Sequence, residues 1–137
     1  FEELMGMFEA KNVDFSTLPK GNPLHEGTGA GRGFAVSGGV AQAVVDAIHR
    51  IEPDREVKTV YAEGLQECRK MVALARAGKY DGYLLEGMGC PGGCVAGMGT
   101  LQPANTSAAA IAKYKKDAES QNAWDSKYKV KLESLEE

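Results

Sequence analysis

The chain has 137 residues, enough for one domain with a hydrophobic core and too few for two. Its composition, 43% hydrophobic and 26% charged residues, is that of an ordinary globular protein and excludes a fibrous or disordered chain. The formal net charge of -3 lacks the positive surplus typical of nucleic-acid-binding proteins, so we expect no nucleic-acid partner.

Other features bear on the cellular location. No apolar run approaches the about 18–20 residues of a membrane helix, so we expect no membrane partner. The N-terminal residues 1–4 are acidic and amphipathic, unlike a signal peptide, and the start at a residue other than Met suggests a piece of a longer chain. The three cysteines, Cys68, Cys90 and Cys94, are an odd number and form no disulfide framework, which indicates a reducing compartment in which any role for them lies in metal or redox chemistry. We therefore expect a cytoplasmic protein.

The first part of the chain alternates helices with glycine-rich loops. Apolar residues at helical spacing predict an amphipathic helix over residues 2–11, and the prolines and glycines of residues 12–23 predict a loop. A glycine-dense stretch, residues 27–33, precedes a helix that is predicted to start near Val40 with Ser37 as its N-cap. The free N–H groups at such a helix start suit an anion.

A βαβ unit is predicted next. Residues 57–61 and 80–85 have strand patterns, and residues 65–77 between them have a helical pattern. A helical crossover of this length favours parallel pairing, so the expected fold class is α/β, a small parallel sheet flanked by helices. Helix is predicted again over residues 106–118, with Thr106 as the cap, and near residues 125–135.

The loop that holds Cys90 and Cys94 follows the second predicted strand directly. Open α/β sheets bind their ligands at this end of the strands. Two thiolates four residues apart can bind one metal centre, but an iron–sulfur cubane and zinc each need four ligands, so this chain alone cannot complete a site. Cys68 lies within a predicted helix and is expected to pack there, while His25 and His49 are expected at the surface. On spacing alone, reduced loop cysteines without a role are an equal alternative.

Two segments together resemble the iron-only ([FeFe]) hydrogenases. Residues 88–94, MGCPGGC, look like the third cysteine motif of that family. Upstream, TGAG at residues 28–31, Phe34, and SGGV at residues 37–40 look like its Thr-Gly-Ala-Gly…Phe-Gly-x-Thr/Ser-Gly-Gly-Val stretch. The resemblance covers roughly residues 1–103. It implies that the chain is a C-terminal fragment of the catalytic domain in the large hydrogenase polypeptide, forming one lobe of it, with the remainder to residue 137 as a helical tail.

The resemblance also implies roles for individual residues. Cys90 would ligate the [4Fe–4S] cubane of the H-cluster, and Cys94 would ligate the cubane and bridge to the diiron subcluster, where protons and electrons combine to give H2. Met88 and Phe34 match catalytic-pocket residues near the diiron centre, with ordinary core packing as the alternative for each.

The predicted helix start adds a cofactor-binding expectation. Because thiolate-ligated clusters are anionic, Ser37, Gly38 and Gly39 are expected to face the cluster from the helix N-terminus. Gly38 should then lie within about 10 Å of a Cys90 or Cys94 sulfur. Close packing of the helix on the sheet is the alternative explanation for both glycines.

The sequence also departs from the family pattern. Ala35 stands where glycine is usual, Gln42 stands where glutamate is common, and residues 97–103 replace Gly-Gly-Gly-Gln-Pro. The two earlier cysteine motifs, with the other cubane ligands and the proton-relay cysteine, are not in this chain. Alone it is therefore expected to hold no cluster and to evolve no hydrogen. The expected partners are the rest of the hydrogenase chain and ferredoxin.

Three functions remain open from the sequence. The leading one is part of an oxidoreductase that interconverts H2 with protons and electrons, with a hydrogen-sensing homologue as a variant of it. The second is a hydrogenase-like iron–sulfur assembly or scaffold protein without a diiron centre, against which Met88 and the intact Pro91-Gly92-Gly93 argue. The third is a free-standing α/β domain whose glycine loop binds a small anion.

Overall fold

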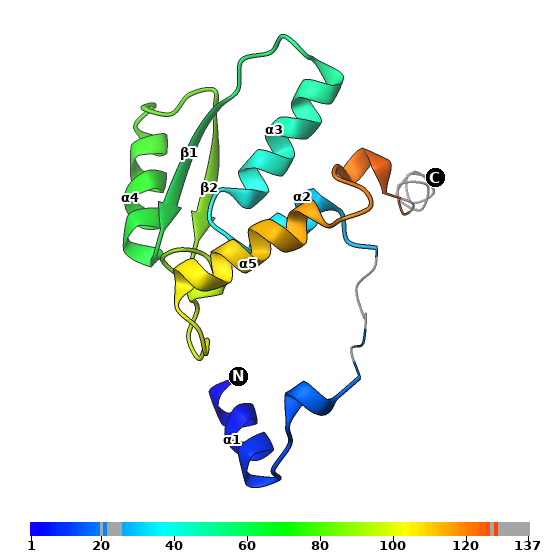
Figure 1. Cartoon of the computed structure of the whole chain (residues 1–137). Helices are drawn as coiled ribbons and strands as arrows, with labels where there is room; N and C mark the ends of the chain where they lie inside the picture. The colour runs from blue at the N-terminus through cyan, green and yellow to red at the C-terminus, as the bar shows by residue number, and fades with distance from the viewer. Residues whose placement is uncertain (20, 22–25, 127, 129–137) are drawn as a thin grey trace, which may run out of the picture.

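The structure is a computed structural model that describes residues 1–19, 21, 26–126 and 128 (Figure 1). Its helices, 3-10 helices (η) and strands follow in the order α1 (Glu2–Ala10), η1 (Phe15–Thr17), α2 (Gly29–Arg32), η2 (Gly33–Ala35), α3 (Gly39–Ile51), β1 (Lys58–Glu63), α4 (Leu65–Arg76), β2 (Tyr83–Met88), η3 (Cys94–Ala96), α5 (Ala104–Lys116) and η4 (Ala123–Asp125). Within these ranges, no helix is long and apolar enough to cross a membrane. His25 and most of the helix predicted near residues 125–135 lie outside the described residues.

The two strands form a parallel pair, as predicted. β1 pairs with β2 so that Lys58 lies opposite Tyr83 and Glu63 lies opposite Met88. α4 is the crossover between them, which parallel pairing requires because the chain must return to the same end of the sheet. α4 lies on one side of the strands and α3 on the other (Figure 1). The expected α/β fold, a small parallel sheet flanked by helices, is therefore confirmed.

The strand register assigns side chains to the two faces of the sheet. Side chains of neighbouring strand residues point to opposite faces, so the paired Ala62 and Gly87 share one face and the paired Tyr61 and Glu86 share the other. The first face meets α4, because a Cβ at Gly87 would lie only 3.2 Å from the Cys68 Sγ atom. The second face meets α3, where the Glu86 carboxylate is hydrogen-bonded. Gly87 thus allows α4 to pack directly on β2.

The buried apolar core is made of small or flexible side chains. Within the described residues its members are Ala30, Ala41, Ala62, Met71 and Ala118. Small side chains let the helices approach the sheet closely but bury little apolar area. Large apolar side chains remain exposed elsewhere, as the 74% exposure of Leu65 illustrates.

The start of α3 differs from the prediction. Ser37 is not its N-cap. Gly38 occupies that position with a left-handed φ of 84°, and the helix start therefore has no hydrogen bond from a cap side chain. The helix begins at Gly39, where a Cβ would collide with the carbonyl oxygen of Gly33. The glycine pair therefore provides a left-handed conformation and a close approach to η2 that other residues could not. The alternative, close packing of the helix on the sheet, applies only to Gly38, where a Cβ would lie 3.8 Å from the Tyr61 ring.

Two other helix starts also differ from prediction. The glycine stretch forms the short helix α2, where the Thr28 hydroxyl accepts the N–H of Gly31 at 3.1 Å. Arg32 secures this turn, since its guanidinium donates to the carbonyl oxygens of Gly27 and Tyr114. α5 begins at Ala104 with Pro103 as its N-cap, so the assignment of Thr106 as the cap is wrong.

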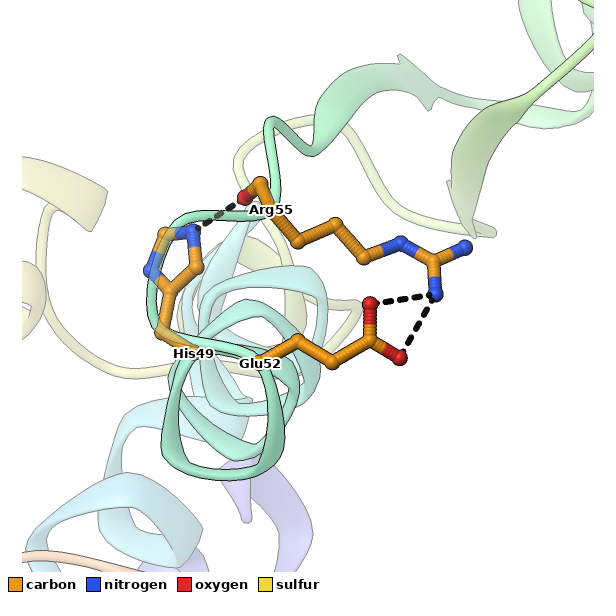
Figure 2. Close-up of polar contacts among 3 residues, drawn as sticks. All are labelled: His49, Glu52 and Arg55. Carbon is orange, nitrogen blue, oxygen red and sulfur yellow. Dashed lines mark hydrogen bonds and ion pairs between the residues drawn. The ribbon is translucent and has the colours of Figure 1, made fainter.

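His49 lies at the surface, as expected. It belongs to the last turn of α3, and its Nε2 atom lies 3.0 Å from the backbone oxygen of Arg55 (Figure 2). The Arg55 guanidinium forms an ion pair with the Glu52 carboxylate, with 3.2 Å between nitrogen and oxygen, and this contact stabilises the turn after the helix (Figure 2). These contacts explain His49 as a residue of the connection to β1.

Replacing Gly39 by alanine should destabilise the fold. We expect Gly39→Ala to lower the free energy of unfolding by about 1–3 kcal/mol, because the backbone of η2 must move to admit the new methyl group. Gly6→Ala is the matched control, since nothing lies within 4 Å of a Cβ at that position in α1. Urea denaturation measures both variants. Equal stability of Gly39→Ala and the wild type would show that the contact between α3 and η2 is not close.

Candidate functional site

The two loop cysteines lie at the carboxyl end of the sheet. β2 ends at Met88 and Cys90 follows it, which confirms that the loop begins just past the second strand. Gly92 and Gly93 have φ values of 83° and 87°, and the N–H of Gly93 closes a turn onto the carbonyl oxygen of Cys90 at 3.0 Å. Cys94 then opens η3 and is exposed, while Cys90 is half-buried. This turn reverses the direction of the chain between Cys90 and Cys94, so both thiols belong to one short loop.

This loop packs against the segment of residues 35–37. A Cβ at Gly93 would lie 2.7 Å from both the carbonyl oxygen of Ala35 and the backbone nitrogen of Ser37. Such a distance excludes any side chain larger than hydrogen. The structure therefore brings together two segments that are more than fifty residues apart in the sequence, both of which the sequence analysis singled out. The distance from Gly38 to the cysteine sulfurs stays a prediction.

A buried carboxylate joins β2 to the start of α3. Glu86 accepts the N–H of Gly38 at 3.0 Å and that of Ala41 at 2.8 Å. The N–H of Gly39 bonds to the carbonyl oxygen of Val36 at 3.0 Å. Three N–H groups at the helix start, where an external anion was expected to bind, are thus paired within the chain. Sequence reasoning missed Glu86, although it is the only charged residue in the strand Tyr83–Met88 and that isolation was a usable signal.

A second carboxylate, Glu63, contacts the loop itself. Its Oε2 atom accepts the N–H of Gly92 at 2.8 Å. This bond, helped by the nearby Ser37 hydroxyl, holds the pKa of Glu63 below its ordinary value, and desolvation opposes it only weakly. Although Ser37 Oγ lies close to Glu63, it is buried and lacks a partner in good hydrogen-bond geometry within the described residues. Ser37 therefore has the Glu63 carboxylate as a neighbouring acceptor, without a well-formed hydrogen bond to it.

The remaining predicted residues lie around the same end of the sheet. Met88 is half-buried, and its carbonyl oxygen accepts the N–H of Gly64 at 2.8 Å. Phe34 belongs to η2, just before residues 35–37, and is 45% exposed. The Cys68 thiol lies 3.6 Å from the carbonyl oxygens of Ala62 and Met88, in agreement with its expected packing role. Phe34 and Met88 keep their pocket roles as predictions.

These residues fit one side of an iron–sulfur site. The part of the chain that the structure describes contains no group of three or more His, Cys, Asp or Glu side chains able to hold a metal ion. Two thiols in a tight glycine loop could contribute two ligands, and the Ser37 hydroxyl, in the segment that the loop contacts, could contribute one hydrogen-bond donor. A cubane at this loop would need two further ligands from other protein segments.

Removing the Glu86 carboxylate should loosen the attachment of α3. We expect Glu86→Ala to lower the free energy of unfolding by about 1.5–3 kcal/mol, because two N–H groups lose a charged acceptor. Glu67→Ala is the control, since Glu67 is exposed and bonded only to Lys70 on the same helix. It should change stability by less than about 0.5 kcal/mol. Equilibrium denaturation in urea distinguishes the two, and equal effects would argue against the role given to Glu86.

Comparison with known proteins identifies the family. The model of the iron only hydrogenase large subunit, C-terminal domain, matches residues 1–98. The periplasmic [Fe] hydrogenase large subunit of Nitratidesulfovibrio vulgaris is 29% identical, over 71% of this chain and 30% of the relative. The NADP-reducing hydrogenase subunit HndD of Solidesulfovibrio fructosivorans is 28% identical, over 71% of this chain and 21% of the relative. The chain thus spans less than a third of the length of either relative, and it belongs to the family defined by the C-terminal domain of the large iron-only hydrogenase polypeptide.

Proposed function

We propose that this chain is part of an iron-only hydrogenase that catalyses the reversible oxidation of H2 to protons and electrons. The observation that carries the proposal is the close packing of the Cys90–Cys94 loop against residues 35–37, where there is no room for a side chain at Gly93. The family match supports it independently. Both segments that resemble the hydrogenase motifs meet at this contact.

Each residue of the site has a proposed role. Cys90 would be a ligand of the [4Fe–4S] cubane, and Cys94 would be a ligand shared by the cubane and the diiron subcluster. When bound, the H-cluster supplies the redox-active iron at which protons and electrons combine. The Ser37 hydroxyl, which is buried and forms no well-aligned hydrogen bond although Glu63 is near, is proposed as a donor to an acceptor of the cluster. Met88 and Phe34 line the pocket beside it.

The helix start contributes less directly than the sequence suggested. The N–H groups of Gly38 and Gly39 are already hydrogen-bonded within the chain, so they donate no hydrogen bond to the cluster. The start of α3 acts on the cluster through the positive end of the helix dipole, and the negative charge of Glu86 partly offsets this effect. The lack of side chains at these two glycines leaves room for other parts of the chain, since a Cβ at Gly39 would meet the Gly33 carbonyl oxygen and a Cβ at Gly38 would lie 3.8 Å from the Tyr61 ring. Gly38 and Gly39 are therefore proposed to belong to the cofactor site only through the helix start that they form.

The proposed partners follow from the missing ligands. The rest of the hydrogenase chain supplies the other cubane ligands and covers apolar residues that are exposed here, such as Leu65 and Met98. Ferredoxin is the proposed electron partner. A cytoplasmic location is supported by the three unpaired cysteines, although one relative is named periplasmic.

A hydrogen-sensing homologue is the second candidate. It is favoured by Gln42, which stands where the family commonly has glutamate and whose amide bonds to Asp46 on the exposed side of α3. An iron–sulfur assembly protein without a diiron centre is the remaining alternative. Cysteine motifs upstream in the full-length protein separate it from the hydrogenase, because only the hydrogenase requires the proton-relay cysteine.

Substitution of Cys94 tests the proposal most directly. In the full-length protein, Cys94→Ser should reduce hydrogen evolution to background, because the ligand shared by the two parts of the cluster is lost. Cys68→Ser is the control and should retain most of the activity, since that thiol packs on Gly87 and contacts the backbone oxygens of Ala62 and Met88. Hydrogen evolution from reduced methyl viologen measures both. Full activity of Cys94→Ser, or its loss in Cys68→Ser, would contradict these assignments.

The isolated chain should bind no cluster. We expect the purified 137-residue chain to contain no stoichiometric iron after treatment with iron and sulfide, because it offers two of four cubane thiolates. Iron analysis and the visible absorbance of the sample measure this. A stable cluster band would show that the loop holds a cluster without the rest of the protein.

A further inference from the structure

The cysteine loop is tied to β1 by a single side chain. Glu63 is the last residue of β1, and its carboxylate accepts the N–H of Gly92, midway between Cys90 and Cys94. In the part of the chain that the structure describes, no other hydrogen bond joins residues 89–93 to a distant segment. The orientation of this loop therefore depends on Glu63 more than on any other polar contact.

The geometry at the end of β1 supports this contact. Gly64 follows Glu63 with a φ of 81°, and its N–H is held by the carbonyl oxygen of Met88 at 2.8 Å. Pro91 Cγ lies 3.7 Å from the position of a Cβ at Gly64, so the loop passes directly over this turn. The loop also meets residues 35–37 through Gly93. It is thus held by one packing contact and by one hydrogen bond.

Favourable electrostatics cannot explain a glutamate at position 63 beside the cysteine loop. A carboxylate beside an anionic iron–sulfur cluster repels it, so a site selected only for charge would have a neutral or cationic residue at this position. Glu63 is exposed, and water and salt screen its charge, which limits the repulsion. The geometric function of the side chain, to accept the Gly92 N–H, remains effective under these conditions.

We propose that Glu63 is a positioning residue that holds the Cys90–Cys94 loop in its ligating conformation before the cluster binds. The inference rests on the proposed function, because it assigns the loop a cluster to receive. Glutamine keeps an acceptor oxygen at the same reach and removes the charge, whereas alanine removes both. The two variants therefore separate a geometric role from an electrostatic one.

The experiment uses the full-length protein, prepared without its clusters, as wild type, Glu63→Ala, Glu63→Gln and the control Glu67→Ala. Hydrogen–deuterium exchange of the peptide that contains residues 89–95 reports the loop. Glu63→Ala should speed its exchange by about three- to tenfold, which is the change expected for the loss of one hydrogen bond. Glu63→Gln and Glu67→Ala should both stay near the wild type. Unchanged exchange in Glu63→Ala would overturn the proposal.

Reconstitution with iron and sulfide gives the second readout. Glu63→Ala should bind less iron per chain or show a shifted electron paramagnetic resonance spectrum of the reduced cubane, and Glu63→Gln should restore the wild-type values. If the wild type binds no iron, the proposed function fails. If it binds iron and Glu63→Ala is indistinguishable from it, only the positioning role fails. If the circular dichroism spectrum shows that Glu63→Ala is unfolded, the test rests on Glu63→Gln. Altered hydrogen exchange or an altered cluster spectrum in Glu63→Gln would rule out a geometric role for Glu63.

Discussion

The buried carboxylate of Glu86 is the contact on which the arrangement of this domain depends. A buried charge is costly unless it is fully hydrogen-bonded, and here two N–H groups and the positive end of α3 compensate it. β2 carries Glu86 and leads into the cysteine loop, while α3 follows the segment on which that loop rests. One side chain thus fixes the position of both parts of the candidate site relative to each other.

The parallel register explains how a second carboxylate can serve the loop. Glu63 pairs with Met88, and Tyr61 pairs with Glu86, so both acids point to the face of the sheet that meets α3. They are staggered along the strands, and the one nearer the end reaches Gly92 in the loop. The sheet therefore provides a fixed spacing between the helix start and the loop, which a flexible connection could not maintain.

Sequence patterns predicted the regular elements well and the contacts between them poorly. The βαβ unit and its parallel pairing were correct, because a period-two strand and a helical crossover are strong local signals. Ser37 was assigned as a cap from its residue type, but Glu86, almost fifty residues later, caps the helix instead. The short helix of residues 29–32 was missed, since glycine disfavours helix and its Thr28 and Arg32 contacts are visible only in three dimensions. The location of the cysteine loop was predicted, whereas its neighbours Glu63 and Glu86 were not.

The tight seating of the cysteine loop has a consequence for how such a sequence can diverge. Within the loop, Gly92 and Gly93 have left-handed backbones, and Gly93 in addition has no space for a methyl group, so mutation there is restricted even before any chemistry is lost. The restriction continues at Gly97, where a Cβ would lie 3.2 Å from the Cys94 carbonyl oxygen and 3.7 Å from the Cys90 Sγ atom. It ends at Met98, which is 98% exposed, so substitutions at Met98 and at residues 100–103 leave the cysteines undisturbed. The departure of this segment from the family pattern is therefore compatible with an intact site.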